Sequence, residues 1–293
     1  MPNTDRPSAF LAVIGGSGFY RMPGLEDVER WSPQTPFGAP SDEIVIGTLH
    51  DKRVAFLPRH GAGHRLMPHE IPVRANIWSL KALGVQGILA VSAVGSLRAE
   101  IAPGHMVTPD QIIDRTRGGR PTTFFGDGIV AHVGFADPFC ADLSTRLVSA
   151  ANEIGQPVHA GGTYIAMEGP LFSTRAESQL YRSWGASIIG MTALPEAKLA
   201  REAELAYAML ATATDYDVWH ESEADVTAAA VAQIVAQNVA SAQRIVAAVA
   251  RDLPSDWVSS ADGALEGAIM TDAKRIPPEI RERYSLLLGR RLP

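Results

Sequence analysis

The chain has very little cysteine: Cys140 is the single one among 293 residues. One cysteine cannot form an internal disulfide, which excludes the small secreted proteins that depend on a disulfide framework. We interpret Cys140 as a small packed residue rather than as a nucleophile. Its isolation is typical of a reducing compartment, and we therefore expect a cytoplasmic protein.

Positive charge is also scarce, with 26 Lys and Arg against 32 Asp and Glu and a net charge of −6. The first 250 residues hold no basic concentration, so neither nucleic acid nor an anionic membrane surface is an expected partner. A small anionic substrate remains compatible, because only a local pocket must be positive. Length and composition otherwise suit a globular protein with a substantial core.

Long hydrophobic runs are absent. The apolar run near the N-terminus, residues 9–14, is short and ends in glycines, which predicts a first strand rather than a signal peptide. The most apolar long segment, residues 224–250, is interrupted by Asp225, Gln233, Gln237, Asn238 and Arg244. We therefore expect no membrane span and a soluble protein.

Short apolar strands alternate with helical patterns, which predicts an α/β fold. The expected strands are residues 11–14, 44–49, 54–57, 87–91, 163–167, 187–191 and 206–213. Expected helices cover residues 72–83, where Gly84 supplies the stop, and a segment from Ser173 or Thr174 to Gly185 that opens with the capping box T-R-A-E. Residues 225–251 carry an apolar stripe at helical spacing, which we interpret as core packing against the sheet.

The domain organisation follows from where these patterns begin and end. We expect a flexible N-terminus over residues 1–8, one catalytic domain over residues 9–252 and a C-terminal appendage over residues 253–293. The appendage contains a short, locally basic helix at residues 278–288. Its run of leucines, Leu286 to Leu288, needs a surface to pack on, either its own domain or a neighbouring subunit.

Polar segments follow several predicted strands, where open α/β sheets bind ligands. G-G-S-G at residues 15–18 offers backbone N–H groups and the Ser17 hydroxyl to an anion, and P-R-H-G at residues 58–61 adds Arg59 and His60. S-A-V-G-S at residues 92–96 is predicted as a third turn with free amides and hydroxyls. Dinucleotide and Walker phosphate-loop spacings are absent, and S-A-V-G-S is no G-x-S-x-G nucleophile motif.

His60, His64 and His69 raise the question of a metal site. The Gly and Pro residues between them fit no regular helix face, and no Cys or carboxylate completes a known ligand spacing. We therefore expect no metal. Residues 114–136, rich in Gly, Arg and Thr, are predicted to form a long functional loop.

The segment M-E-G-P-L-F-S-T-R at residues 167–175 and G-M-T at residues 190–192 carry groups suited to a nucleoside. Glu168 can accept hydrogen bonds from sugar hydroxyls, Phe172 can stack on a flat ring, and Met191 can line an apolar sugar face. Each residue taken alone is more often a core or capping residue. Their combination with the other strand-end segments favours a binding pocket.

The most specific segment is A-T-D-Y-D, which ends a strand-like run with Asp215 and Asp217. Side chains two apart on an extended chain point the same way, so both carboxylates can converge on one ligand. Such a pair can accept hydrogen bonds from an exocyclic amine and, if one is protonated, donate to a ring nitrogen. Beside an anion-binding site, this predicts inorganic phosphate attacking a nucleoside.

The order of the motifs resembles a known family. G-G-S-G, R-H-G-x-G-H-R-x-x-P-H, R-A-N-I-W, S-A-V-G-S-L, I-D-R-T, M-E-G-P-x-F-S-T-R-A-E, G-M-T-A-L-P-E-A-x-L-A-R-E and A-T-D-Y-D-x-W are similar to the 5′-methylthioadenosine phosphorylases, of the trimeric branch of purine nucleoside phosphorylases. The resemblance runs from about Leu11 to Arg251. It implies one α/β domain on a mixed, partly barrel-like sheet. It also implies a homotrimer, or a dimer of trimers, with its sites at subunit interfaces.

The resemblance also implies a role for each matching residue. Inorganic phosphate is the co-substrate, without a metal or other cofactor, and its ligands match Ser17, Arg59, His60, Ser92, Thr192 and the amide of Ala93. Met191 matches the residue under the ribose, and Met167 and Phe172 match sugar- and base-pocket positions. Asp215 and Asp217 match the residues that select a 6-aminopurine. His132, and an apolar wall from the tail helix, match positions that reach a neighbouring subunit's 5′ substituent.

Two departures from the family pattern stand out: Ser17 replaces a common Thr, and Leu171 a common Arg. The expected reaction converts 5′-methylthioadenosine to adenine and 5-methylthioribose 1-phosphate, with Asp215, Asp217 and His60 as catalytic residues of a pentosyltransferase in purine and methionine salvage. A 6-oxopurine nucleoside or methylthioinosine phosphorylase is the nearest alternative, in which Asn is expected instead of Asp215. A non-catalytic purine-binding sensor is the alternative from another class.

Overall fold

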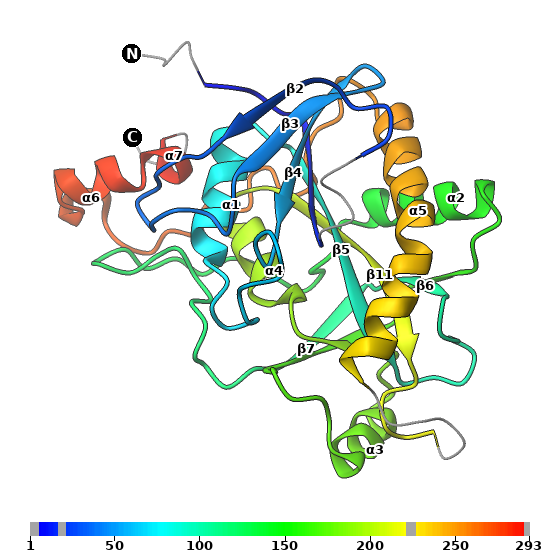
Figure 1. Ribbon diagram of the computed structural model, residues 1–293. Coiled ribbons are helices and arrows are strands. Elements are labelled where there is room, and N and C mark those ends of the chain that lie inside the picture. Colours follow the sequence, from blue (N-terminus) through cyan, green and yellow to red (C-terminus); the bar gives the residue numbers. More distant parts are fainter. Residues whose placement is uncertain (1–5, 17–21, 221–226, 290–293) are drawn as a thin grey trace.

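The computed structural model describes residues 6–16, 22–220 and 227–289 (Figure 1). Its strands are β1 (Leu11–Gly15), β2 (Glu26–Trp31), β3 (Ile44–Leu49), β4 (Lys52–Pro58), β5 (Gly87–Ser96), β6 (Met106–Thr108), β7 (Gln111–Arg115), β8 (Val158–Ala160), β9 (Thr163–Met167), β10 (Ile188–Gly190) and β11 (Ala206–Asp215). Its helices are α1 (Val73–Ala82), α2 (Ala141–Glu153), α3 (Arg175–Ser183), α4 (Ala193–Glu202), α5 (Ala228–Asp252), α6 (Pro278–Arg283) and α7 (Ser285–Leu288), with a 3₁₀ turn, η2, at Ala273–Arg275.

The strands form one mixed sheet in the order β2-β3-β4-β1-β5-β10-β9-β7, with β11, β6 and β8 branching from β5. The branch exists because β5 has different neighbours along its length. β1 pairs with its first half, β11 runs parallel to nearly all of it, and β10 pairs antiparallel with Gly95 and Ser96 at its end. The sheet splits there and stays open, and the mixed single-domain α/β fold expected from the sequence is confirmed.

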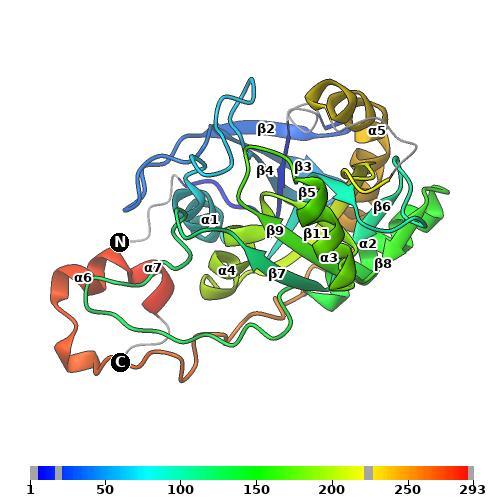
Figure 2. The same ribbon diagram turned by 90° about the horizontal axis from the view of Figure 1, so that it is seen from below.

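Helices cover both faces of the sheet, as parallel strands require. One apolar core lies under α1 and α4 and contains Ile77, Leu80 and Leu199, whereas a second lies under α2 and α5 and contains Leu147 and Ile245. Figures 1 and 2 show these two helix pairs on opposite sides of β5 and β11. Both central strands are almost wholly buried, which explains their continuous apolar sequences.

Capping and stop residues in the sequence correctly predicted the bounds of two helices. α1 ends before Gly84, which adopts a φ of +82°, and α3 begins with the reciprocal capping box of Thr174 and Glu177 before Gly185 closes it at a φ of +82°. The long loop after β7 is present. By contrast, β2, β6, β7, β8, α2 and α4 were missed, because they are short, exposed or lack a clear apolar period.

The prediction of a turn at S-A-V-G-S is wrong, because these residues continue β5 to Ser96. Val94 pairs with Ala213 of β11, so the backbone stays hydrogen-bonded and extended where the small residues suggested a break. Ser92 therefore projects from a rigid central strand. A side chain fixed on a strand is held more closely in place than one on a turn.

The C-terminal appendage packs on its own chain. Leu287 and Leu288 of α7 are 3% and 2% exposed and join the α1–α4 core together with Ile276 and Tyr284. Arg283 pairs with Asp127 in the long loop. Docking of the appendage at a subunit interface, and the domain bounds at residues 9 and 252, stay predictions. No helix among the described residues is both long and apolar enough to cross a bilayer.

Candidate active site

A cavity of about 1130 Å³ opens where β5 and β11 end and α5 begins. Ten of the predicted site residues line it: Arg59, His60, Ser92, Ala93, Met167, Phe172, Met191, Thr192, Asp215 and Asp217. They come from loops and strand ends that are up to 158 residues apart in sequence. Ser17 lies outside the described residues. His132 is exposed and is not part of this chain's cavity lining.

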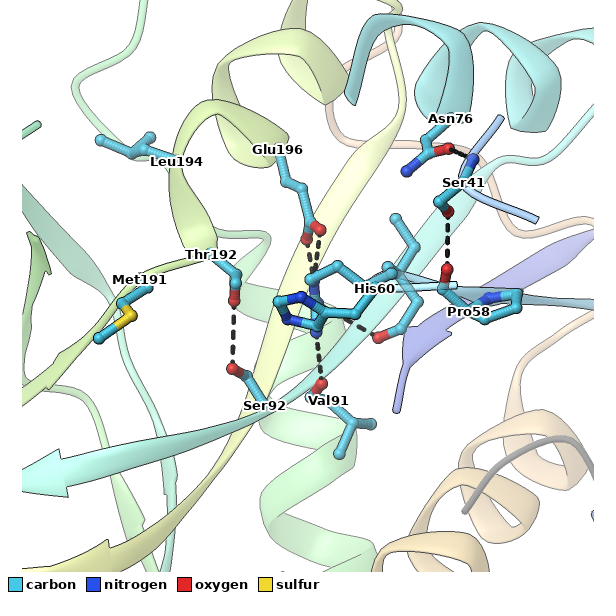
Figure 3. Close-up of polar contacts among 12 residues, drawn as sticks. Ser41, Pro58, His60, Asn76, Val91, Ser92, Met191, Thr192, Leu194 and Glu196 are labelled. Carbon is cyan, nitrogen blue, oxygen red and sulfur yellow. Dashed lines mark hydrogen bonds and ion pairs between the residues drawn. The ribbon is translucent and has the colours of Figure 1, made fainter. Parts of the chain in front are cut away.

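Two hydroxyl groups face each other at the cavity wall. Ser92 Oγ of β5 and Thr192 Oγ1, which follows β10, are 3.1 Å apart (Figure 3). Thr192 occupies the position before α4, but its side chain makes no capping hydrogen bond and is directed to the cavity instead. Two hydroxyls at this spacing can both donate to one oxyanion.

Arg59 is not the free forked donor that its motif suggested. Its side chain is 3% exposed, and Glu196 accepts hydrogen bonds from Nε at 2.5 Å and from Nη2 at 3.1 Å. Nη2 and Nη1 also donate to the carbonyl oxygens of Ile14 and Val91. A buried guanidinium requires such compensation, because an unpaired charge in the interior is costly. These four hydrogen bonds leave one Nη1 N–H for a ligand at the cavity wall.

The backbone that carries Arg59 is held from the other side as well. Ser41 Oγ donates to the carbonyl of Pro58 at 2.6 Å, and the Ser41 amide donates to Asn76 Oδ1 of α1 at 2.8 Å (Figure 3). The end of β4 is therefore tied to α1. This support gives the cavity wall a fixed position.

His60 is a neutral imidazole at physiological pH. Burial, helped by the neighbouring charges of Arg59 and His64, lowers its pKa to about 4 from 6.5. Its Nδ1 donates to the carbonyl of Leu66 at 2.8 Å, and its ring stacks on His64 with centroids 4.1 Å apart. The Nδ1 contact fixes the tautomer and leaves Nε2 as the atom available to a ligand.

The carboxylates of Asp215 and Asp217 converge, but not through strand alternation. β11 ends at Asp215, and Asp217 follows in a turn with a φ of +50°. Asp215 Oδ1 accepts from the Asp217 amide at 2.8 Å, and its Oδ2 accepts from Thr214 Oγ1 at 2.7 Å. Gly95 leaves room for the pair, since a Cβ there would lie 3.0 Å from Asp215 Oδ1.

Burial raises the pKa of both acids above the usual value for aspartate. Asp217 is 7% exposed, and hydrogen bonds from the Ser173 and Ser178 hydroxyls oppose the rise in its pKa. Its carboxylate lines the cavity and can also accept from a ligand N–H. The raised pKa favours the protonated form needed to donate to a ring nitrogen.

Glu168 does not face the sugar position. Its Oε1 accepts from Arg120 Nε at 3.0 Å and its Oε2 accepts from the Arg117 amide at 2.6 Å, and it is absent from the cavity lining. Arg120 also donates to the carbonyl oxygens of Met191 and Leu194. Glu168 and Arg120 thus attach the long loop to the segment that carries Met191.

The apolar stripe of α5 has two roles rather than one. Its second half, including Ile245, Val246 and Val249, is buried in the core as predicted. Its first half, including Val231, Val235 and Val239, is only half-buried and lines the cavity. The sequence pattern is the same in both halves, so only the packing distinguishes them. No cluster of three or more metal-ligating side chains occurs among the described residues.

Comparisons with known proteins agree with this geometry. A model of the phosphorylase superfamily matches residues 10–251. The S-methyl-5′-thioadenosine phosphorylase of Geobacter sulfurreducens is 58% identical over 279 residues, which is 95% of this chain and 98% of the relative. The enzyme of the same name from Chloroflexus aurantiacus is 55% identical, covering 97% of this chain and 98% of the relative. The chain belongs to the S-methyl-5′-thioadenosine phosphorylase family.

Solved structures of this family share its fold. A methylthioadenosine phosphorylase from an Antarctic soil metagenomic library superimposes with a TM-score of 0.90 at 48% identity, covering 97% of this chain and 100% of that one. The methylthioadenosine phosphorylase of Schistosoma mansoni in complex with adenine superimposes with a TM-score of 0.81 at 33% identity, covering 96% and 98%. The family resemblance found in the motifs is confirmed along nearly the whole chain.

Proposed function

We propose that this enzyme catalyses phosphorolysis of 5′-methylthioadenosine to adenine and 5-methylthioribose 1-phosphate, a pentosyl transfer in purine and methionine salvage. Membership of the phosphorylase family supports phosphorolysis as the reaction class. The single structural observation that supports the substrate is the cavity itself. It brings the Ser92–Thr192 hydroxyl pair, the Asp215–Asp217 carboxylates and the apolar half of α5 around one space.

Inorganic phosphate is the proposed co-substrate, and no metal or organic cofactor takes part. It binds at the hydroxyl end of the cavity, where Ser92, Thr192, the amide of Ala93 and the remaining N–H of Arg59 donate to its oxygens. The neutral His60 presents Nε2 there, which can accept from a protonated phosphate oxygen. Ser17 is assigned to the same site from the family resemblance.

Adenine binds at the carboxylate end. Asp215, protonated more readily than an ordinary aspartate, donates to N7, and the carboxylate of Asp217 accepts from the 6-amino group. Phe172, 42% exposed at the cavity, stacks on the base. A proton or a strong hydrogen bond at N7 stabilises the departing purine, so this contact lowers the barrier to cleavage of the glycosidic bond.

The sugar lies between the two ends, against Met191 and Met167. As the glycosidic bond breaks, the bound phosphate captures the developing ribosyl cation, whose charge the phosphate itself stabilises. No side chain is needed as a covalent nucleophile. The valines of α5 receive the methylthio group, because an apolar thioether gains from contact with apolar side chains.

The assembly that we propose is a cytoplasmic homotrimer or a dimer of trimers. His132 supports it, because this residue is exposed and away from its own chain's cavity and is thus free to reach a neighbour's 5′ substituent. Light scattering coupled to size-exclusion chromatography measures the assembly directly. A monomeric mass with full activity contradicts this part of the proposal.

The decisive experiment incubates the purified enzyme with methylthioadenosine, with and without phosphate, and identifies base and sugar products by chromatography and mass spectrometry. Release of adenine and methylthioribose 1-phosphate only with phosphate is the expected result. Adenine released equally without phosphate indicates a hydrolase. Preferential cleavage of inosine or methylthioinosine indicates the 6-oxopurine alternative, and binding without any release indicates a sensor.

A further inference from the structure

A buried polar network lies directly behind the proposed phosphate position. Glu196, in the first turn of α4, is 1% exposed and accepts three hydrogen bonds. Two come from the guanidinium of Arg59, and the third comes from Tyr207 Oη of β11 at 2.9 Å to Oε2. The network therefore joins β4, α4 and β11 beneath the cavity wall.

Glu196 limits what Arg59 can present to a ligand. The guanidinium plane of Arg59 is fixed by four hydrogen bonds. Nε and Nη2 donate to the Glu196 carboxylate, and Nη2 and Nη1 donate to two backbone carbonyl oxygens. Arg59 lines the cavity whereas Glu196 does not. The carboxylate thus has no direct contact with the cavity, and it offsets the charge of the arginine that does line it.

The same turn of chain connects Glu196 to the hydroxyl pair. Thr192 precedes it by four residues, and the intervening Leu194 has extended rather than helical backbone angles, φ −112° and ψ 137°. A shift of Glu196 would be transmitted to Arg59 through the ion pair and to Thr192 through this short connection. Arg59 and Thr192, two of the proposed donors to phosphate, thus both depend on one buried carboxylate.

We infer that Glu196 is a positioning residue for phosphate: it orients Arg59 and anchors the Thr192 segment, so that both meet the oxyanion in one geometry. This role rests on the proposed phosphorolysis, and in it Glu196 makes no contact with substrate. A fixed donor loses less conformational freedom when the anion binds, and this lowers the cost of binding and of reaching the transition state.

The test variant is Glu196→Gln, which keeps the shape but offers Arg59 one acceptor and one competing donor. We expect the KM for phosphate to rise by at least about tenfold, as for loss of a charge-assisted hydrogen bond, while the KM for methylthioadenosine changes less than about twofold. Tyr207→Phe, which removes one donor to Glu196, should raise the phosphate KM by about two- to fivefold.

Glu202→Gln is the matched control. Glu202 lies on the same helix, is 8% exposed and accepts from Thr123 Oγ1 and the Phe124 amide, both at 2.7 Å, outside the cavity lining. The same chemical change there should lower thermal stability but leave both KM values unchanged. Phosphate-induced stabilisation against heat, measured without nucleoside, gives a second readout that does not depend on catalysis.

The outcomes separate the inference from the function. A phosphate KM and a phosphate-induced thermal shift within about twofold of wild type in a folded Glu196→Gln enzyme overturn the inference. Equal effects of Glu196→Gln and Glu202→Gln also overturn it, since they indicate a general structural role. If wild-type enzyme fails to release adenine in a phosphate-dependent manner, the proposed function itself fails.

Discussion

At the scale of single residues, burial gives the cavity its chemistry. It raises the pKa of Asp215 and Asp217 and lowers that of His60 to about 4. The two acids are therefore protonated more readily than ordinary aspartates, as the proposed purine contact requires, and His60 is a neutral imidazole at the proposed phosphate position.

Asp215→Asn should change which purine the enzyme accepts. An amide nitrogen carries two hydrogens and can donate both to N7 and to the neighbouring 6-oxo group, whereas a protonated carboxyl carries one; the variant also cannot transfer a proton to N7. We expect the ratio of kcat/KM for adenosine over inosine to fall by at least about 100-fold. Steady-state kinetics with both nucleosides measure it, and an unchanged ratio contradicts the assignment of Asp215 to the base.

His60→Gln should flatten the pH dependence of stability in a defined window. The native pKa of about 4 lies below the unfolded value of 6.5, so the unfolded chain takes up the proton first as pH falls. The stability associated with neutral His60 is complete above pH 6.5 and is lost progressively toward pH 4. In the variant this loss disappears.

Urea unfolding at several pH values between 4 and 7 measures the effect as the difference in slope between wild type and variant. His69→Gln, at an exposed histidine of the same loop, controls for simple removal of a ring. If the His60 variant and wild type lose stability in parallel, His60 is not held neutral in the folded protein.

At the scale of elements, α5 combines two surfaces in one helix. Its C-terminal half stabilises the fold through the α2–α5 core, and its N-terminal half offers valines to the cavity. The long loop after β7 similarly works through Arg120, which holds the Met191 segment by its backbone. Both elements thus position residues that line the cavity: α5 carries valines, and the loop holds the segment of Met191.

Val235→Ser should reduce the preference for a methylthio group. The substitution places a hydroxyl on the apolar wall, which is unfavourable next to a thioether and tolerable next to the 5′-hydroxyl of adenosine. We expect kcat/KM for methylthioadenosine relative to adenosine to fall about tenfold. Ala240→Ser, on the exposed side of α5, is the control. Equal losses for both nucleosides would argue against this role.

At the scale of the whole molecule, the C-terminal appendage completes the core. Leu287 and Leu288 belong to the same buried apolar cluster as Phe124 and residues of α1 and α4. Tyr284 and Arg283 contact the long loop at Asp127. The appendage therefore contacts the same long loop whose Arg120 donates to the carbonyl oxygen of Met191.

Leu287→Ala should destabilise the protein by about 2–4 kcal/mol, as for other buried leucines. Leu286→Ala, at the partly buried neighbour, should cost less. Thermal and urea unfolding measure both variants over a range of protein concentrations. If the loss depends steeply on concentration, the leucine acts mainly at a subunit interface and not within its own chain's core.

The sequence by itself determined the fold class, the family and ten of the residues that line the cavity. These features depend on local rules: alternation of strands and helices, the Thr174–Glu177 capping box, the stop at Gly84, and strand-end segments that meet at one edge of a sheet. Local interactions act over a few residues, so their signals can be recognised without coordinates.

Only the tertiary structure decided how those side chains are engaged. Glu196 pairs with Arg59, which lies 137 residues away in sequence. Glu168 pairs with Arg120 and does not line the cavity, whereas half of the apolar stripe of α5 does line it. The choice of partner for a buried charge, and the side of a helix left uncovered, depend on how distant elements pack. That packing energy is shared by the whole molecule, and no short segment of sequence contains it.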